Sequence, residues 1–352
     1  MMYYLKYRPA SLAEIDNQKR QEILTKIFQS SDLPHAFLFI GPKGTGKTST
    51  ARIIAKILNC EQNQGKKKLN PQSCNQCENC LAIAKNRFLD VYELDAASSR
   101  GIDDIRSLRD QVSYAPTRGA YKVYIIDEVH MLTKEAFNAL LKTLEEPPSH
   151  VVFILATTES HKLPETIISR CLTVPFQKAN LVEIRQSLLR IVKGEKLKVS
   201  EATLDLIAKS SQGSFRDAAK LLELAVSTTD LTEKAVSSLL KSNSQVEPEQ
   251  FLKLVLAKQT APALKFLQDY DSQGLDYSWL IEALLEELRV MLLIKKGLID
   301  DSQIGSIINK TTLSEISRLM KILLEAYQLT KSSPIEALPL MIAVVEFAQE
   351  KV

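Results

Sequence analysis

One glycine-rich segment of the chain reads Gly41-Pro42-Lys43-Gly44-Thr45-Gly46-Lys47-Thr48. It follows the apolar run 36–40 and leads into a helical pattern of apolar residues over 48–58. A strand, a glycine-rich turn and a helix start in that order are the setting of a P-loop. Glycine lets backbone N–H groups close around phosphates because it has no Cβ atom, and the start of the helix attracts anions further. The segment therefore predicts a nucleoside triphosphate site.

Two side chains of this loop have specific tasks in such a site. Lys47 would reach the β- and γ-phosphates, and the hydroxyl of Thr48 would bind Mg²⁺. Ser49, the next residue, completes the ATP-binding set expected of this segment. A chance loop of glycine, lysine and threonine is the alternative, and the strand before it and the helix after it argue against that alternative.

Length and composition limit the classes of protein to consider. A chain of 352 residues is too long for one ordinary core, so two or three domains are expected. An apolar fraction of 45% and a charged fraction of 25% are typical of a soluble globular protein. No apolar run is long enough to span a bilayer, and residues 1–9 contain no signal core, so we expect a cytoplasmic protein without a membrane partner. A net charge of +3 permits contact with nucleic acid without demanding it.

Strand-like apolar runs alternate with helical patterns in the first half of the chain. The predicted strands are 36–40, 91–94, 122–126, 151–156 and 172–176, and further helices are predicted over 102–112 and 134–144. Short buried runs separated by helices indicate a parallel sheet, so residues 1–178 are expected to form an α/β nucleotide-binding domain.

Beyond residue 178 the apolar residues recur with the period of a helix. A small helical domain is expected over 179–242, with a polar linker at 241–245, and a third, all-helical domain over 243–352. The predicted helices are 181–192, 202–210, 215–226 and 234–240 in the first of these domains, and 249–257, 261–270, 277–296, 313–330 and 334–350 in the second.

Four of the five cysteines follow the P-loop helix with the spacing C-x13-C-x2-C-x2-C. They are Cys60, Cys74, Cys77 and Cys80. Four thiolates within reach of one tetrahedral centre suit Zn²⁺, and clustered cysteines in a cytosolic chain favour a metal over disulfides. Four protein ligands close such a site, so we expect a structural zinc module at about residues 60–80, with four free thiols as the alternative.

The apolar run 123–126 ends in two acids, Asp127 and Glu128. In P-loop enzymes the first acid of such a pair holds the Mg²⁺ shell and the second polarises the attacking water. Lys47, Asp127 and Glu128 are therefore the predicted catalytic residues, and Thr48 and Asp127 the predicted Mg²⁺ ligands. His130 is given no role.

Three further positions suit a site that responds to the nucleotide. The next strand ends in Thr157 and Thr158, where a polar residue can sense the γ-phosphate, although an ordinary strand cap is the alternative. Arg170 is either a surface residue or an arginine finger that reaches the γ-phosphate of a neighbouring chain. Arg216, at a helix start, can fold over the nucleotide and report hydrolysis as motion.

These motifs as a set resemble the AAA+ clamp-loader family, in particular its bacterial gamma/tau branch. The resemblance covers residues 3–240. It rests on the P-loop, on the four-cysteine insertion and on the segments 123–131, 138–148, 155–158, 162–164, 169–171 and 213–217.

The resemblance implies an α/β AAA+ P-loop NTPase domain with an inserted zinc module, then a small helical lid domain and an all-α collar domain. The implied cofactors are ATP, Mg²⁺ and Zn²⁺. Thr158 would be the first sensor of the nucleotide and Arg216 the second, and Arg170 would complete the site of a neighbouring subunit. The residues that would line the adenine pocket are Tyr4, Arg8 and Pro9.

By the same resemblance the chain would be an ATPase subunit of the clamp loader in the bacterial DNA polymerase III holoenzyme, whose polymerase active site lies on another subunit. A five-subunit ring with delta, delta-prime and further gamma copies would open the sliding clamp when ATP binds. Hydrolysis would then release the clamp on primed-template DNA. The residues expected to contact DNA phosphates, near helix N-termini, are Ser99, Arg100 and Thr133.

Other members of the superfamily are the alternatives. The segment Asp16-Asn17-Gln18 stands where relatives have a Gly-Gln pair, and the gap between Cys60 and Cys74 is longer than in relatives. A delta-prime-like subunit would carry a degraded P-loop, and a replication-factor-C-like subunit would lack the cysteine cluster. A scaffold that uses ATP as a structural switch would not need Glu128, and a branch-migration helicase motor would carry a winged helix in place of the collar.

Overall fold

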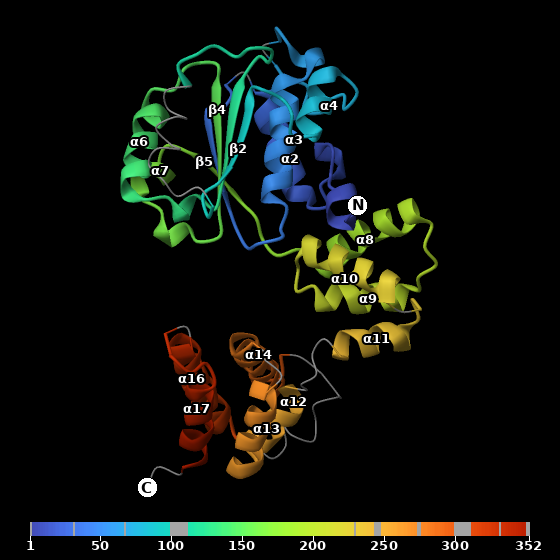
Figure 1. Cartoon of the computed structure of the whole chain (residues 1–352), viewed down its shortest axis with the longest axis vertical. Coiled ribbons are helices and arrows are strands. Elements are labelled where there is room, and N and C mark those ends of the chain that lie inside the picture. The colour runs from blue at the N-terminus through green and yellow to red at the C-terminus, as the bar shows by residue number, and fades with distance from the viewer. Residues whose placement is uncertain are drawn as a thin grey trace. The chain divides into compact units, whose positions relative to one another are not determined.

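The computed structural model describes residues 2–30, 32–66, 68–98, 112–228, 230–242, 248–272, 276–298, 311–330 and 332–349. The chain divides into two compact units, Met1–Leu240 and Lys241–Val352. The first unit contains the strands, and the second is helical in its described residues (Figure 1).

Five parallel strands form the sheet of the first unit, in the order β2-β3-β4-β1-β5. They are β1 (Ala36–Ile40), β2 (Val91–Asp95), β3 (Lys122–Asp127), β4 (Val151–Thr157) and β5 (Leu172–Pro175). Each agrees closely with its predicted run. The connection that leaves β1 runs toward one edge of the sheet, to β2, whereas the connection that leaves the neighbouring β4 passes β1 and runs to β5 at the other edge. The direction of the connections therefore switches between β1 and β4. The crevice at the carboxyl ends of strands beside such a switch point is the usual ligand site of an open α/β sheet.

Helices cover both faces of this sheet (Figure 1). Successive side chains of a strand point to opposite faces, so in β1 Phe37 and Phe39 pack on one face while Ala36 and Leu38 pack on the other. With both faces buried, the strands are apolar throughout instead of alternating. The first face is covered by α2 (Gln18–Gln29), α3 (Lys47–Asn59) and α4 (Glu78–Ala84), and the second by α6 (Lys134–Glu145) and α7 (Glu165–Ile168).

The helices predicted over 48–58 and 134–144 are confirmed as α3 and α6. The helix predicted over 102–112 lies outside the described residues except for Val112. Helices α2 and α4 are absent from the sequence prediction. Short 3-10 turns complete this part of the unit at Leu12–Glu14, Glu61–Asn63, Val129–Met131 and Ser160–Lys162.

A helical lid follows the sheet within the first unit. Its helices are α8 (Leu181–Glu195), α9 (Glu201–Ser210), α10 (Phe215–Thr228) and α11 (Glu233–Ser242), which agree with the four predicted helices. Asn180 and Glu183 form a reciprocal capping box that fixes the start of α8. The tyrosines of the N-terminal helix α1 (Tyr3–Lys6) pack against the core of the lid. The N-terminal segment is therefore held by helices that come much later in the chain.

The second unit is a bundle of helices in its described residues. They are α12 (Pro248–Leu256), α13 (Thr260–Ser272), α14 (Tyr277–Lys295), α16 (Leu313–Thr330) and α17 (Leu338–Ala348). The last helix starts later than predicted, because Ser333 and Ile335 form a local turn and Pro339 takes a place in the first helical turn.

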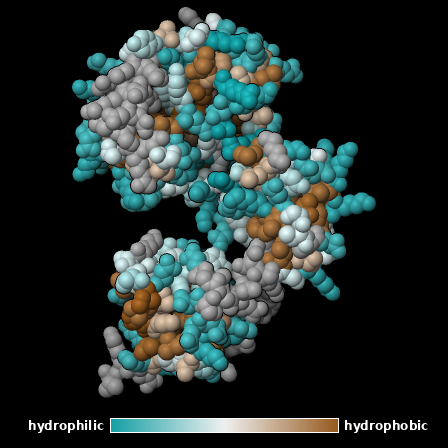
Figure 2. All heavy atoms as spheres, in the orientation of Figure 1, coloured by the Kyte–Doolittle hydropathy of each residue, from teal (hydrophilic) through white to brown (hydrophobic). Residues whose placement is uncertain are grey.

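The surface of this second unit carries apolar patches in the view of Figure 2. Leu338, Ile342 and Val345 of α17 are exposed and spaced so that they share one side of the helix. We call these three residues the α17 stripe. None of the described helices combines the length and the hydropathy needed to cross a membrane.

Candidate nucleotide and metal sites

The P-loop connects the end of β1 to the start of α3. Gly44 has a φ of +78°, and a Cβ atom there would lie 2.0 Å from Oγ of Ser214, so only glycine fits. A Cβ atom on Gly41 would meet the carbonyl oxygen of Phe176 at 1.8 Å. Lys47 is buried, and its Nζ donates to the carbonyl oxygens of Gly41 at 2.7 Å and Pro42 at 3.0 Å. Burial lowers the pKa of Lys47.

Thr48 and Asp127 meet at the carboxyl edge of the sheet. The Thr48 hydroxyl donates to Oδ2 of Asp127 at 2.6 Å. The second carboxylate oxygen, Oδ1, accepts a hydrogen bond from the backbone N–H of Glu128 at 3.0 Å. Hydroxyl and carboxylate oxygens are the ligands that Mg²⁺ takes in phosphate-binding sites, so this pair fits the ion.

Glu128 directly follows β3 and is held by Thr158, which directly follows the neighbouring strand β4. The backbone N–H and the hydroxyl of Thr158 donate to Oε2 of Glu128 at 3.2 and 3.0 Å. Thr157 is not in this contact, because its hydroxyl oxygen lies 3.0 Å from Nδ1 of His130. The sequence prediction gives no role to His130. Its Nδ1 atom lies 3.4 Å from the same oxygen, Oε2, of Glu128. Of the two threonines, Thr158 is the one that reaches the acid.

Lys47, Thr48, Asp127 and Glu128 border a cleft of about 330 Å³ between the P-loop, the N-terminal segment and the lid. That volume lies in the range of small-molecule sites. The guanidinium of Arg216 lies over the ring of Tyr4, 4.8 Å from its centroid. The cleft is lined by most of the predicted residues, while Gly41, Pro42, Thr158 and Arg170 are outside the lining. The predicted residues that line it are Tyr4, Arg8, Pro9, Lys43, Gly44, Thr45, Gly46, Lys47, Thr48, Ser49, Asp127, Glu128 and Arg216.

At and beside the cleft, the sheet module and the lid make contacts that the sequence prediction missed. Arg190 of α8 donates two hydrogen bonds to the carboxylate of Asp16, at 2.5 and 2.6 Å. The Asn17 side chain donates to Glu183 at 2.9 Å, and the N–H of Phe215 donates to the Gly44 carbonyl at 3.0 Å. The only sequence signal of these contacts was the unusual Asp16-Asn17-Gln18 segment.

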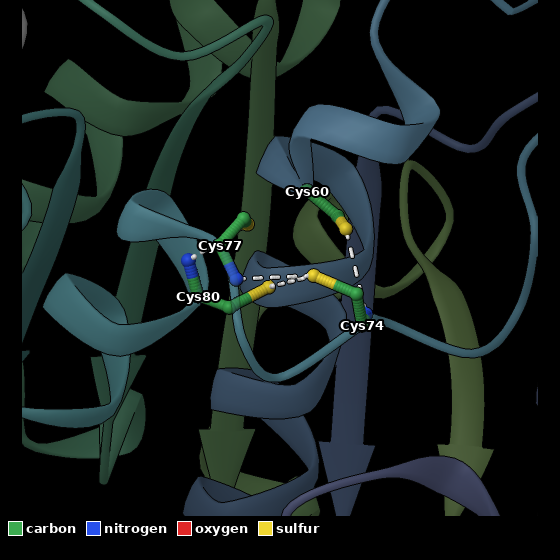
Figure 3. Close-up of side chains that lie close together, drawn as sticks. All are labelled: Cys60, Cys74, Cys77 and Cys80. Atoms are coloured by element: carbon green, nitrogen blue, oxygen red, sulfur yellow. Dashed lines mark hydrogen bonds between the residues drawn. The ribbon is translucent and has the colours of Figure 1, made fainter.

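The four predicted zinc ligands converge on one point (Figure 3). Their sulfur atoms all lie within 4.8 Å of one another, a separation that suits four thiolates around one tetrahedral Zn²⁺. Burial raises the pKa of Cys60 and Cys80, whereas at Cys74 the N–H groups of Gln76 and Cys77 outweigh burial and bring the pKa to about 7. The convergence of four sulfur atoms on one point is what fits a zinc ion.

A buried lysine connects this cysteine cluster to the nucleotide module. Lys56 lies on α3, the helix that begins at the P-loop. Its Nζ donates to the carbonyl of Ala10 and, at 2.6 Å, to the side-chain oxygen of Asn75, which lies between two of the cysteines in sequence. Ala10 directly follows Pro9, which lines the cleft.

Arg170 and Thr133 lie outside the lining of the cleft. Arg170 pairs with Glu145 at 2.7 Å and donates to the carbonyl of Thr166 at 2.8 Å, on the face of the sheet that α6 and α7 cover. The Thr133 hydroxyl caps α6 by accepting the N–H of Ala136 at 3.2 Å. Ser99 and Arg100 lie outside the described residues.

Comparisons with known proteins agree with this architecture. A family model described as DNA polymerase III, delta subunit, matches residues 16–180. A model described as DNA polymerase III clamp loader subunit, ATPase lid domain, matches residues 183–230. The Thermotoga maritima RuvB Holliday junction branch migration motor has a TM-score of 0.51 and 20% identity, and the match covers 71% of this chain and 79% of that one. At that identity the likeness concerns the AAA+ fold alone.

Curated relatives carry the name of one subunit type. DNA polymerase III subunit tau of Bacillus subtilis (strain 168) is 44% identical over 301 residues, which are 84% of this chain and 53% of that protein. The tau subunit of Escherichia coli (strain K12) is 41% identical over 82% of this chain and 44% of its own length. The gamma subunit of Buchnera aphidicola subsp. Baizongia pistaciae (strain Bp) is 42% identical over 67% of this chain and 63% of its own.

The chain thus spans about half the length of the tau relatives that it matches. A P-loop AAA+ fold with a helical lid, together with identity to tau and gamma subunits over most of the chain, places it in one family. The chain belongs to the clamp-loader ATPases and is a homologue of the tau and gamma subunits of bacterial DNA polymerase III.

Proposed function

We propose that the chain binds and hydrolyses ATP in the cleft as a clamp-loader subunit, and so drives the opening and loading of the sliding clamp. The contact between the Thr48 hydroxyl and Asp127, 2.6 Å apart beside the P-loop, carries this proposal. This contact brings together the P-loop and the end of β3, which are distant in sequence. They meet at the carboxyl edge of the sheet, where open α/β sheets bind ligands. Lys47 would hold the β- and γ-phosphates, and Thr48 and Asp127 would hold Mg²⁺, which when bound neutralises charge on the phosphates.

Glu128 would then act on the attacking water. A carboxylate can accept a proton from a water as that water attacks the γ-phosphate, provided that the carboxylate faces it. Glu128 instead bonds to both the N–H and the hydroxyl of Thr158. In the proposal Thr158 is the sensor: when its hydroxyl turns to the γ-phosphate, Glu128 loses one of its two donors and is free to turn toward the water.

The lid and the N-terminal segment would hold the rest of the nucleotide. Arg216 lies over Tyr4 at the lid side of the cleft, where a guanidinium suits a phosphate. Tyr4, Arg8 and Pro9 would border the adenine. Burial lowers the pKa of Arg8, and the positive charges of Arg52 and Arg216 lower it further. A bound anion would offset the repulsion between these cations.

Arg170 would serve a neighbouring subunit. It is outside the lining of its own cleft and is held by Glu145 and Thr166 at the other face of the sheet. An arginine that cannot reach its own nucleotide and is partly exposed suits a role in trans.

The cysteine cluster would hold a structural Zn²⁺, and the α17 stripe supports a collar role for the second unit. Exposed apolar residues on one side of a helix are typical of surfaces that other chains cover.

The proposed assembly is a five-membered ring with delta, delta-prime and further gamma copies. Its other partners are a sliding clamp and the phosphates of primed DNA. Ser99, Arg100 and Thr133 remain the proposed DNA contacts, and the cytoplasm the proposed location.

Steady-state ATP turnover of the full chain with clamp-loader partners tests this function. Turnover should rise when sliding clamp and primed DNA are added together. Glu128→Gln should keep ATP binding and lower turnover by about 10²- to 10⁴-fold, because it removes the proton acceptor.

A second candidate is a scaffold that binds ATP without hydrolysing it. The intact Lys47, Asp127 and Glu128 disfavour it. Equal and near-zero turnover of the unsubstituted chain and of Glu128→Gln, with normal ATP binding and all partners present, would support the scaffold and refute the motor.

A further inference from the structure

Arg20 is a buried cation in the wall of the nucleotide cleft. It lies in the first turn of α2, where its backbone N–H bonds to the capping side chain of Asn17. The residue is only 5% exposed. Among the described residues its guanidinium donates one hydrogen bond, from Nη1 to the carbonyl oxygen of Thr45, in the P-loop, at 3.5 Å. Its Nε is buried and has no partner among the described residues.

No described carboxylate balances the charge of Arg20 at ion-pair distance. Glu183 of the lid is the acid that attracts it. The carboxylate of Glu183, however, already accepts hydrogen bonds from the side chain of Asn17 and the N–H of Asn180. The ring of Phe176 lies 3.9 Å from the guanidinium carbon and supplies a cation–π contact in place of an ion pair. Burial lowers the pKa of Arg20 to about 10, so the group is still charged at neutral pH.

A desolvated cation without a counter-ion is unfavourable for the empty protein. The cleft beside it already holds the cations Arg8, Lys43, Lys47 and Arg216. The same lining holds four acids, Asp16, Asp95, Asp127 and Glu128, of which Asp16 pairs with Arg190. With Arg20 and Arg190 included, the basic residues of the lining still outnumber the acidic ones by six to four. The group that would balance such a set of charges is a polyanion of the size of a nucleotide polyphosphate.

We propose that Arg20 is a determinant of nucleotide affinity that acts as a fixed positive charge beside the P-loop. It touches the loop through a carbonyl oxygen, so it would attract the polyphosphate by charge through the loop. This inference rests on the proposed nucleotide site and adds to it a residue that the P-loop motif does not contain.

Arg20→Met tests the charge, because methionine keeps the apolar stem and the contact with an aromatic ring. Full-length chains are titrated with Mg-ATP and with Mg-ADP, and their thermal unfolding is measured without nucleotide. Arg20→Met should weaken ATP binding by about 10- to 100-fold, the order expected for a unit charge several ångströms from an anion in a medium of effective dielectric about 20. ADP carries less charge, so its binding should weaken by a smaller factor.

Two matched variants separate charge from structure. Arg20→Lys keeps the charge and should bind ATP with an affinity nearer that of the unsubstituted chain than that of Arg20→Met. Arg185→Met removes an arginine of the lid that pairs with the exposed Glu201 outside the cleft, and it should change nothing in the titrations. The unfolding midpoint of Arg20→Met without nucleotide should stay the same or rise, since an unbalanced buried charge is removed.

Unchanged ATP affinity in Arg20→Met would overturn the inference and leave the nucleotide site standing. Equal losses for ATP and ADP with a lowered midpoint would overturn it too, because they would mark Arg20 as a structural residue. Failure of the unsubstituted chain to bind either nucleotide would overturn the proposed site itself, and this inference with it.

Discussion

The ion pair between Asp16 and Arg190 joins the sheet module to the lid, and its removal gives a sharp test of how the cleft is held together. The Asp16 side chain is 5% exposed and that of Arg190 is 34% exposed, and two hydrogen bonds of 2.5 and 2.6 Å link them. Arg190→Met leaves the buried carboxylate of Asp16 without its partner. Such a loss costs about 3–5 kcal/mol for a fully buried pair.

The partial exposure of Arg190 reduces that cost, because water can solvate the carboxylate once the guanidinium is gone. We therefore expect Arg190→Met to lower the free energy of unfolding of the first unit by roughly 2–4 kcal/mol. With a urea m-value of about 2–3 kcal/mol per molar, the midpoint would fall by roughly 1 M.

Urea unfolding followed by far-UV circular dichroism and by tryptophan fluorescence measures this effect. The chain has one tryptophan, Trp279, in the second unit, so fluorescence serves as an internal control that should not move. Arg185 lies on the same helix as Arg190 and pairs with Glu201 of α9, which is 84% exposed. Arg185→Met should therefore cost at most about 1 kcal/mol.

The double variant Asp16→Asn/Arg190→Met should regain much of the loss, because no charge is then left buried. A cost of Arg190→Met no larger than that of Arg185→Met would refute the reasoning. It would show that water reaches Asp16 and that the pair behaves as a surface contact.

Three other predictions concern the proposed roles. Lys47→Ala should weaken ATP binding at least about 100-fold, since it removes a charge-assisted contact with the phosphates; fluorescent-nucleotide titration checks this, and normal affinity would contradict the P-loop role. Arg170→Ala should keep ATP binding near normal but lower turnover in the assembled ring by about 10³- to 10⁵-fold, whereas unchanged turnover would exclude a finger. Cys77→Ser should lower both the bound zinc per chain, measured by elemental analysis, and the unfolding midpoint; full zinc content in this variant would show that Cys77 is not a ligand.

Local sequence signals predict most of the fold. The strands are predictable because each is a short apolar run buried on both faces of the sheet. Helix α4 is not predictable in this way, because it has only seven residues. Its first turn is capped by the Cys77 sulfur, so its start depends on how the cysteine loop folds. The start of α17 was missed for a similar reason, since the turn at Ser333 and Ile335 competes with the helix.

Some residues of the candidate site are likewise predictable from the sequence, and others are not. Lys47, Asp127 and Glu128 belong to motifs whose chemistry is readable from neighbouring residues. Asp16 and Arg190 are 174 positions apart, so only the folded chain brings them together. Arg20 belongs to no motif, and it is distinguished only by its burial and by an Nε that has no hydrogen-bond partner among the described residues.

The position of Lys56 has a consequence for how this protein family can change during evolution. Its ammonium is satisfied by Ala10 on one side and by Asn75, within the cysteine loop, on the other. A lineage that lost the loop would keep a buried cation with half of its partners gone. Lys56 and the cysteines should therefore be inherited as a unit, and homologues without the cysteines should carry an uncharged residue at this point of the P-loop helix.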